Sequence, residues 1–498
     1  MDDHRGGGFM ERRGARLPMV CAGLGGAVVG AAAMGYVMGG SALAGTGGAC
    51  GSTSGPCPPG MSAMLATGII GTFAAIILFI AAFLPEGPKA RRLLAAVLCC
   101  ALAVPGSALA FGRLQGPPSV RPAWSAPADQ PAQTVAVAVW QDGETVVRVR
   151  ADRFDAYRAR TGESAWTLDA PPRKSVCAVS PAVDGLAAVG YGSAPAPCDQ
   201  LAAVDLRTGR ELWRKDGVRP SAVELAGPAT LVALDGEQLA AFGLRDGAPA
   251  WTAAPTAGCG FRALSASAAR VVAVEYCATA DPAAGTGTTW LRAFAPTGAA
   301  QWRTNLGAEN EPATAAVLAA DPPTVRLTER GNRGIDAVLS FAAADGAPRA
   351  TIPVSSADYE LTSLRKLYAS FRLRPVRPAA VVGDLLVAAA ARPGDSESRF
   401  VVAHSLTDGS RAWVRKVDGE VLAVTAAPDG PLVAVERGRN LDVVHRLAGA
   451  DGRTVERTDL RKASLYGTSW LGRTDDRYVF VHEGGSAYSR PALGVPRH

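Results

Sequence analysis

A short pattern, repeated through the C-terminal three-quarters of this 498-residue sequence, limits its fold more than any other feature. In each copy a glycine follows Thr or Asp, and a tryptophan stands four residues after that glycine. Successive glycines are roughly 40–60 residues apart, the spacing expected of propeller blades built from about four short strands. The five full copies pair Gly162 with Trp166, Gly209 with Trp213, Gly247 with Trp251, Gly298 with Trp302 and Gly409 with Trp413, and two weaker copies, at Gly346 and Gly452, lack the tryptophan.

Each copy reads as a strand, a tight turn and a second strand. The run Leu201–Leu206 ahead of Gly209 is apolar and predicts a strand. The glycine supplies the positive φ of a two-strand turn. The tryptophan then falls on the following strand, where it can cover the neighbouring unit. An alanine stands six residues before the glycine in four copies, as Ala156, Ala203, Ala241 and Ala403.

The end of the chain indicates how such a ring closes. Residues 463–495 offer only three strands after the last repeat. Upstream, the segment Pro122–Pro127 resembles Pro249–Pro255, which contains a last strand of a repeat. We therefore predict an all-β, eight-bladed propeller whose eighth blade is completed by the strand around Trp124, because closure removes an exposed strand edge. Seven blades with an extra C-terminal strand is the alternative.

Three apolar stretches without charge precede the repeats, at about residues 17–43, 61–84 and 93–112. Each is near the ~20 residues that cross a bilayer as a helix. The expected organisation is a tail (1–16), a three-helix membrane anchor (17–112), a proline-rich linker containing the closing strand (113–131) and the propeller (132–498). Segment one contains the pairs Gly26/Gly30 and Gly35/Gly39, which either permit close helix contact or are chance spacings.

The charges between the apolar stretches predict their orientation. Four arginines lie in the N-terminal tail, and three basic residues, Lys89, Arg91 and Arg92, separate segments two and three, whereas residues 44–60 carry no charge. The basic side faces the cytoplasm. We therefore expect a multi-pass plasma-membrane protein with a cytoplasmic N-terminus and an extracytoplasmic C-terminal domain. The run Lys89–Ala110 also resembles a signal peptide, and cleavage after Ala110 would release the propeller instead.

Six of the nine cysteines fall outside the apolar segments and form three neighbouring pairs. An even number of cysteines in an oxidising compartment predicts disulfides. The pairs Cys177/Cys198 and Cys259/Cys277 stand at similar places in two repeats, which suggests that both units contain the same disulfide. A zinc site is less consistent with the sequence, because it has no Cys-x-x-Cys and few histidines. The expected pairs are Cys50–Cys57, Cys177–Cys198 and Cys259–Cys277.

The segment Ala203–Trp213 closely resembles the repeat of pyrroloquinoline-quinone-like (PQQ-like) propellers, and the other copies match it in part. The resemblance covers roughly residues 120–498. Proteins of this kind include quinone-dependent dehydrogenases and non-catalytic members, among them an outer-membrane assembly scaffold, so the resemblance implies a fold rather than an activity. The excess of Arg over Lys and the abundant Ala and Gly are typical of a GC-rich bacterial genome.

The residues expected of a quinoprotein dehydrogenase are not evident. The only adjacent cysteines, Cys99 and Cys100, lie in apolar segment three. The sequence contains no EF-hand-like calcium loop, no Gly-x-Ser-x-Gly motif of serine hydrolases and no phosphate-binding loop. We therefore predict no catalytic residues, no metal and no cofactor, with PQQ possible but unsupported by site residues. The region after residue 112 is nearly neutral, which argues against nucleic acid as a partner.

The longest interval between repeat glycines contains a basic, amphipathic stretch between residues 355 and 378. Leu361, Leu364, Tyr368 and Phe371 have the spacing of one helix face. This stretch is either a contact site for anionic lipid or an acidic partner, or an ordinary long loop packed on the propeller. The candidate contact residues are Arg365, Lys366, Tyr368, Phe371 and Arg372.

Two functions follow from these observations. The first is a membrane-tethered extracytoplasmic scaffold that binds an unidentified protein or polymer ligand, with the helices in lipid. The second is a membrane-bound PQQ-dependent oxidoreductase. The missing site residues favour the first.

Overall fold

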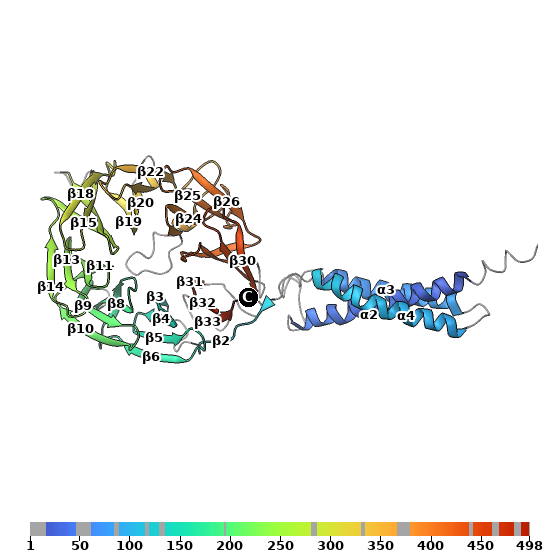
Figure 1. Cartoon of the computed structure of the whole chain (residues 1–498). Helices are drawn as coiled ribbons and strands as arrows, with labels where there is room; N and C mark the ends of the chain where they lie inside the picture. The colour runs from blue at the N-terminus through green and yellow to red at the C-terminus, as the bar shows by residue number, and fades with distance from the viewer. Residues whose placement is uncertain are drawn as a thin grey trace, which may run out of the picture. The chain divides into compact units, whose positions relative to one another are not determined.

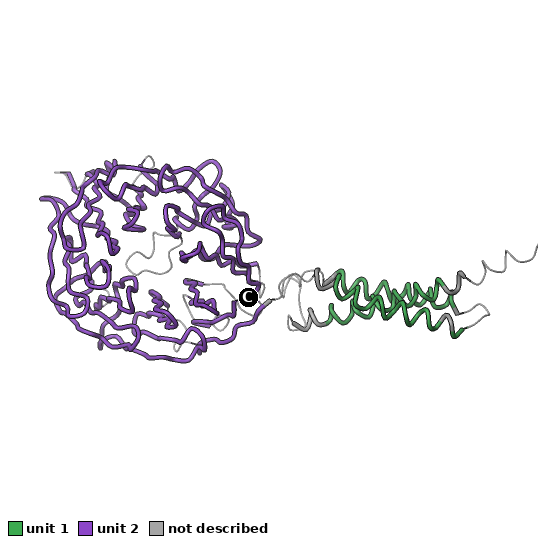
Figure 2. The backbone as a smooth tube through the Cα atoms, viewed as in Figure 1, with its two compact units in different colours: residues 1–119, 438–440 green, residues 120–437, 441–498 purple. Residues whose placement is uncertain are grey.

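The computed structural model describes residues 16–45, 61–83, 89–114, 119–128, 135–193, 196–279, 286–329, 334–365, 379–437, 442–460, 468–482 and 490–497. The chain divides into two compact units, coloured separately in Figure 2. One unit holds the three long helices, and the other holds almost all of the strands.

The helical unit consists of α2 (Arg16–Gly45), α3 (Met61–Phe83) and α4 (Lys89–Leu114), and α2 packs against both of the others. Small residues allow this approach. A Cβ on Gly26 would overlap the backbone of Ala96 in α4, and one on Gly35 would lie 2.6 Å from the Met64 carbonyl oxygen in α3. The glycine pairs of α2 therefore serve close helix contact rather than being chance spacings.

Each of the three helices is long and apolar enough to cross a membrane, over Val20–Gly40, Ala63–Ile80 and Leu93–Ala110. Side chains such as Ile70, Ile77 and Leu102 are largely exposed. Such an apolar outer surface suits lipid rather than water. The helix α4 is continuous through Ala110, and cleavage after that residue stays a prediction.

The second unit is a ring of eight antiparallel sheets, the blades, arranged around a central axis (Figure 1). In each complete blade the first strand is innermost and the fourth is outermost. Blades 1 to 4 are β3–β6 (Ala136–Asp142, Thr145–Arg150, Arg153–Arg158, Ser164–Asp169), β7–β10 (Ser175–Val179, Leu186–Gly192, Cys198–Asp205, Arg210–Asp216), β11–β14 (Pro220–Ala226, Thr230–Asp235, Gln238–Gly243, Pro249–Ala253) and β15–β18 (Cys259–Ala266, Val271–Ala278, Gly287–Phe294, Ala300–Asn305).

The other four blades follow the same plan. They are β19–β22 (Pro312–Ala320, Pro323–Glu329, Asp336–Phe341, Pro348–Pro353), β23–β26 (Ala379–Val382, Leu385–Ala390, Phe400–Ser405, Arg411–Lys416), β27–β30 (Glu420–Thr425, Leu432–Glu436, Val443–Leu447, Thr454–Leu460) and β31–β33 (Thr468–Arg473, Arg477–His482, Ala492–Pro496). A one-turn helix, α5 (Thr362–Arg365), lies between blades 5 and 6 in sequence.

The ring closes as the sequence predicts. The short strand β2 (Trp124–Ser125) pairs with β33, with Trp124 opposite Gly494, and becomes the fourth strand of blade 8. The eight-bladed fold is therefore confirmed, and the seven-bladed alternative is wrong. One strand was not expected: β1 (Ser119–Val120) adds to the outer edge of blade 7 as a fifth strand.

Each repeat tryptophan reaches across the seam to the glycine turn of the next blade. The ring of Trp166 lies against Gly209, where φ is +72° and a Cβ would lie 2.5 Å from the indole. The Trp166 N–H donates to the Leu206 carbonyl at 3.0 Å. Only glycine combines this backbone conformation with such a close approach. The same arrangement joins Trp124 to Gly162, Trp213 to Gly247, Trp251 to Gly298, Trp302 to Gly346 and Trp413 to Gly452.

The alanine of the pattern lies directly opposite the tryptophan on the adjacent strand, as in the pair Ala203 and Trp213. Two seams lack the tryptophan. Between blades 5 and 6, Ala350 stands in its place beside Gly409. Leu361 and Leu364 are buried in the apolar cluster that includes Ile352 of the same strand. Between blades 7 and 8, Glu456 stands there and accepts hydrogen bonds from Tyr478 and Arg497.

The two predicted disulfides within the described residues are confirmed, but they join different pairs of strands in their blades. Cys259 and Cys277 are register partners on neighbouring strands β15 and β16. Cys177 on β7 instead joins Cys198 on β9, across the intervening strand β8. A Cβ on Gly190 of β8 would lie 2.9 Å from the Cys198 sulfur, so the absent side chain makes this crossing possible. The pair Cys50–Cys57 lies outside the described residues.

Candidate functional site

A cavity lined by described residues of the propeller lies at one end of the central channel. It measures about 1030 Å³ and is bounded by the innermost strands β3, β23 and β31, the end of β27, and the segment after β7. Eleven of its 24 lining residues are Ala, Val or Pro, so much of its wall carries small apolar side chains. Its position follows from the fold, because innermost strands of separate blades converge on the channel.

The described lining of this central cavity contains more acidic than basic side chains. Its lining contains Glu144, Asp475 and Arg473 as the only charged residues among those described. Arg473 donates to both carboxylate oxygens of Asp429, at 2.8 and 3.0 Å. Burial alone would raise the pKa of Asp429, but the bonds and positive charge of Arg473 outweigh it and hold that pKa below its ordinary value.

The two lining carboxylates have no such partners. Glu144 and Asp475 are exposed, and neither side chain is hydrogen-bonded or ion-paired to any residue within the described ranges. The strands that precede them, β3 and β31, are joined by a hydrogen bond from the Gln141 amide to the Arg473 carbonyl at 3.0 Å. Both carboxylates therefore lie at the same end of neighbouring blades, and the described lining of the cavity carries an excess of negative charge.

Trp470 is one of two tryptophans that line the cavity, beside Trp140, and the sequence analysis missed it. Of the nine tryptophans, seven donate their indole N–H to a carbonyl, including Trp140, which bonds Ser180 at 2.7 Å. Trp290 lies beneath the Arg303 guanidinium, 3.8 Å from its ring centroid. The Trp470 N–H bonds to no described residue, although the ring lines the cavity. The sequence feature that could have pointed to Trp470 is its place outside the repeat position of the other tryptophans.

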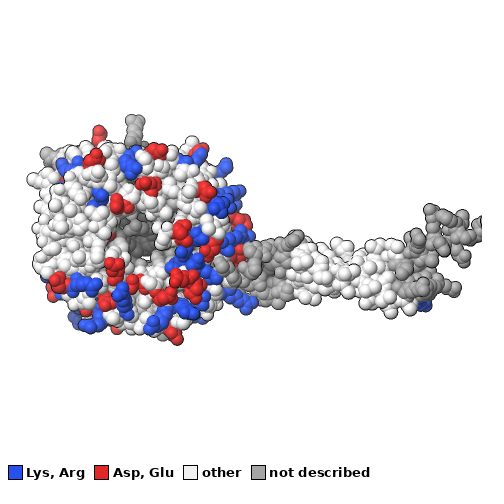
Figure 3. All heavy atoms as spheres, viewed as in Figure 1, with Lys and Arg blue, Asp and Glu red and all other residues white. Residues whose placement is uncertain are grey.

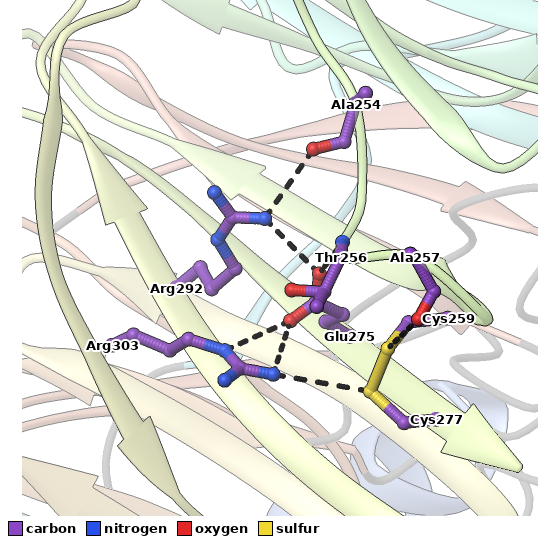
Figure 4. Close-up of a disulfide and its surroundings, with 8 residues drawn as sticks. All are labelled: Ala254, Thr256, Ala257, Cys259, Glu275, Cys277, Arg292 and Arg303. Atoms are coloured by element: carbon purple, nitrogen blue, oxygen red, sulfur yellow. Dashed lines mark hydrogen bonds and ion pairs between the residues drawn. A yellow bond between two sulfur atoms is a disulfide. The ribbon is translucent and has the colours of Figure 1, made fainter.

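A second polar cluster lies on blade 4 (Figure 4). Glu275 is fully buried and forms ion pairs with Arg292 at 3.0 Å and Arg303 at 2.9 Å. It also accepts a hydrogen bond from the Thr256 N–H at 2.6 Å. Burial alone would raise the pKa of Glu275, but these bonds and charges outweigh it and leave that pKa below its ordinary value. The cluster ties the connection from blade 3 to the strands of blade 4.

The adjacent sulfur atoms do not make this cluster a metal centre. Cys259, Glu275 and Cys277 have potential ligand atoms within 4.8 Å of one another. Both sulfurs are joined in the disulfide, and the carboxylate already binds two arginines. A thiolate is the form that binds a metal, so the oxidised cluster acts as a structural brace. The Arg303 guanidinium lies 3.8 Å from the Cys277 sulfur.

The basic stretch contributes to packing in its described part. Arg365 ends α5 and forms an ion pair with Glu360, while Leu364 is fully buried. The other four candidate contact residues, Lys366, Tyr368, Phe371 and Arg372, lie outside the described residues, and their role stays a prediction. Charged side chains of both signs gather over the part of the ring that carries β30 to β33, whereas few cover the part that carries β11 to β15 (Figure 3).

The histidines in the last blades do not form a cluster. His404, His445 and His482 lie on β25, β29 and β32, in three different blades. Burial, together with the positive charge of nearby arginines, lowers the pKa of His445 to about 4. No grouping of potential metal ligands that includes a histidine occurs in the part of the chain that the structure describes.

A family model described as "Outer membrane protein assembly factor BamB" matches residues 198–458. The match covers more than half of the chain and falls entirely within the propeller, so the protein belongs to this family of PQQ-like propellers.

Solved structures with a similar fold have low sequence identity. BamB from Moraxella catarrhalis is 15% identical, with 72% of this chain and 96% of that chain covered and a TM-score of 0.41. Sqt1 from Saccharomyces cerevisiae is 9% identical, with 76% and 98% covered and a TM-score of 0.43. No curated protein matches the sequence.

Proposed function

We propose that this protein is a membrane-tethered, extracytoplasmic propeller that binds a protein partner and has no catalytic activity of its own. The observation that carries the proposal is the match of residues 198–458 to a family described as an assembly factor. An assembly factor acts by holding other proteins, and a propeller offers a rigid ring of turns for that purpose.

The placement outside the cytoplasm is supported by two independent features. The basic residues flank the first and third apolar segments on the side predicted to face the cytoplasm. The two disulfides of the propeller suit an oxidising compartment, because cytosolic thiols are kept reduced. The three apolar helices are long enough to anchor the chain.

The alternative function is a PQQ-dependent oxidoreductase. Such an enzyme is expected to hold its quinone in the channel beside an adjacent-cysteine disulfide and a calcium ion. In this chain Cys99 and Cys100 are free thiols in α4. The described lining of the central cavity contains two carboxylates, Glu144 and Asp475, and no cysteine. These residues fit a quinone–calcium centre poorly, which supports the non-catalytic proposal.

Calorimetric titration of the full-length protein with PQQ, with and without Ca²⁺, separates the two functions. We expect no saturable binding. Saturable binding at micromolar affinity that depends on Ca²⁺ would overturn the proposal and make the oxidoreductase the better account.

A further inference from the structure

The central cavity has the features of a site for a positively charged group. Its one lining cation among the described residues, Arg473, is held by Asp429, so this arginine is not available to attract an anion. Its two lining carboxylates, Glu144 and Asp475, are exposed and unpaired within the described residues. An anionic ligand would meet net repulsion there, whereas a cation would gain two partners.

Trp470, in the cavity lining, fits the same kind of ligand. The indole face of a tryptophan attracts ammonium and guanidinium groups more strongly than other aromatic rings do. The Trp470 N–H, which bonds to no described residue, can donate to a carbonyl of a bound peptide backbone. The ring is also held in place: Gly472 lies directly against it, and any side chain at that position would overlap the indole.

We infer that the central cavity binds a basic segment of the partner protein, with a Lys or Arg side chain inserted between Glu144, Asp475 and Trp470. The volume of about 1030 Å³ is at the upper end for small-ligand pockets and leaves space for long side chains together with backbone. Small wall residues, such as Ala138 and Ala379, place no long side chains in this part of the described lining. This inference rests on the proposed partner-binding function and names the chemistry of the partner.

Calorimetry with a tetralysine peptide tests the site in full-length protein held in zwitterionic nanodiscs, at low salt. Neutral lipid avoids a competing anionic surface. We expect saturable binding, and we expect a tetralysine peptide with acetylated side chains to bind at least about tenfold more weakly, because acetylation removes the positive charge of each side chain.

Variants identify the cavity as the site. The double change Glu144→Gln and Asp475→Asn should weaken tetralysine binding about tenfold, and Trp470→Leu about threefold. A matched pair of changes, Asp169→Asn and Asp395→Asn, removes two exposed carboxylates outside the cavity lining and alters the net charge equally. This control pair should retain affinity within about twofold.

Two results would overturn the inference: no binding of tetralysine to the unaltered protein at millimolar concentration, or equal weakening by the cavity pair and the control pair. These results are distinct from failure of the proposed function. Calcium-dependent PQQ binding would remove the scaffold proposal, whereas a failed tetralysine titration would leave that proposal in place and assign its partner to another surface.

Discussion

Trp124 closes the ring, and its removal should be the most destabilising single change at the N-terminal end of the propeller. Its indole N–H donates to the Ala159 carbonyl at 2.8 Å, and its ring lies against Gly162 in blade 1. It also stacks near Tyr157, with 6.4 Å between ring centroids. Its strand, β2, contributes only two register pairs to blade 8. The Trp124 side chain therefore contributes most of the interactions that hold β2 against blades 8 and 1.

The magnitude follows from these contacts. Removing a fully buried tryptophan costs roughly 3–5 kcal/mol. Trp124 is half-buried, so we expect Trp124→Ala to reduce the free energy of unfolding by about 3 kcal/mol. Trp124→Phe keeps an aromatic ring and loses the hydrogen bond to Ala159, and it should cost about 1–2 kcal/mol.

Urea unfolding of the full-length protein in detergent, followed by circular dichroism, measures both variants. Hydrogen–deuterium exchange should localise the effect, with faster exchange in β33, which loses its outer partner. A change of less than roughly 0.5 kcal/mol in Trp124→Ala, with protection of β33 unaltered, would refute the closure argument.

Three further predictions concern the helices, the disulfides and a buried histidine. Gly26→Leu should separate α2 from α4 and lower the melting temperature in detergent, whereas Gly40→Leu, whose Cβ would meet open space, should not. The β15–β16 disulfide should be reduced by dithiothreitol before the β7–β9 disulfide, as followed by alkylation and mass spectrometry, because both of its cysteines are half-buried, whereas Cys198 of the other is buried, and because an arginine stabilises the leaving thiolate. The folded-state pKa of His445 lies below its ordinary value, so the contribution of the neutral imidazole to the free energy of unfolding is complete above about pH 6.5 and is lost as the pH falls toward 4. His445→Gln should flatten this pH dependence, as measured by urea unfolding.

The repeat pattern made the fold predictable. Each Thr/Asp-Gly turn needs a glycine because its backbone has a positive φ. Each repeat tryptophan lies four residues after that glycine, on the next strand. The closing strand was also predictable, because Trp124 stands in a local copy of the segment around Trp251. These features depend on residues close together in sequence.

Features that depend on contacts across the ring could not be predicted in this way. The disulfide from β7 to β9 requires the bare backbone of Gly190 on the strand between them, which no spacing of cysteines reveals. The cavity arises because the innermost strands of four blades converge with the segment that follows β7 in a fifth, so the grouping of Glu144, Trp470 and Asp475 is visible only in the folded ring. The strand β1 has too few residues to leave a pattern.

The most direct test of the account is the side of the membrane on which the propeller lies. We would place one cysteine at the exposed residue Ser164, in a protein whose three free helix cysteines are replaced by serine, and treat intact cells with a membrane-impermeant maleimide. The account predicts that Ser164→Cys is labelled without lysis, whereas Asp3→Cys in the N-terminal tail is labelled only after lysis. Labelling of Ser164→Cys only after lysis would place the propeller in the cytoplasm and contradict the account.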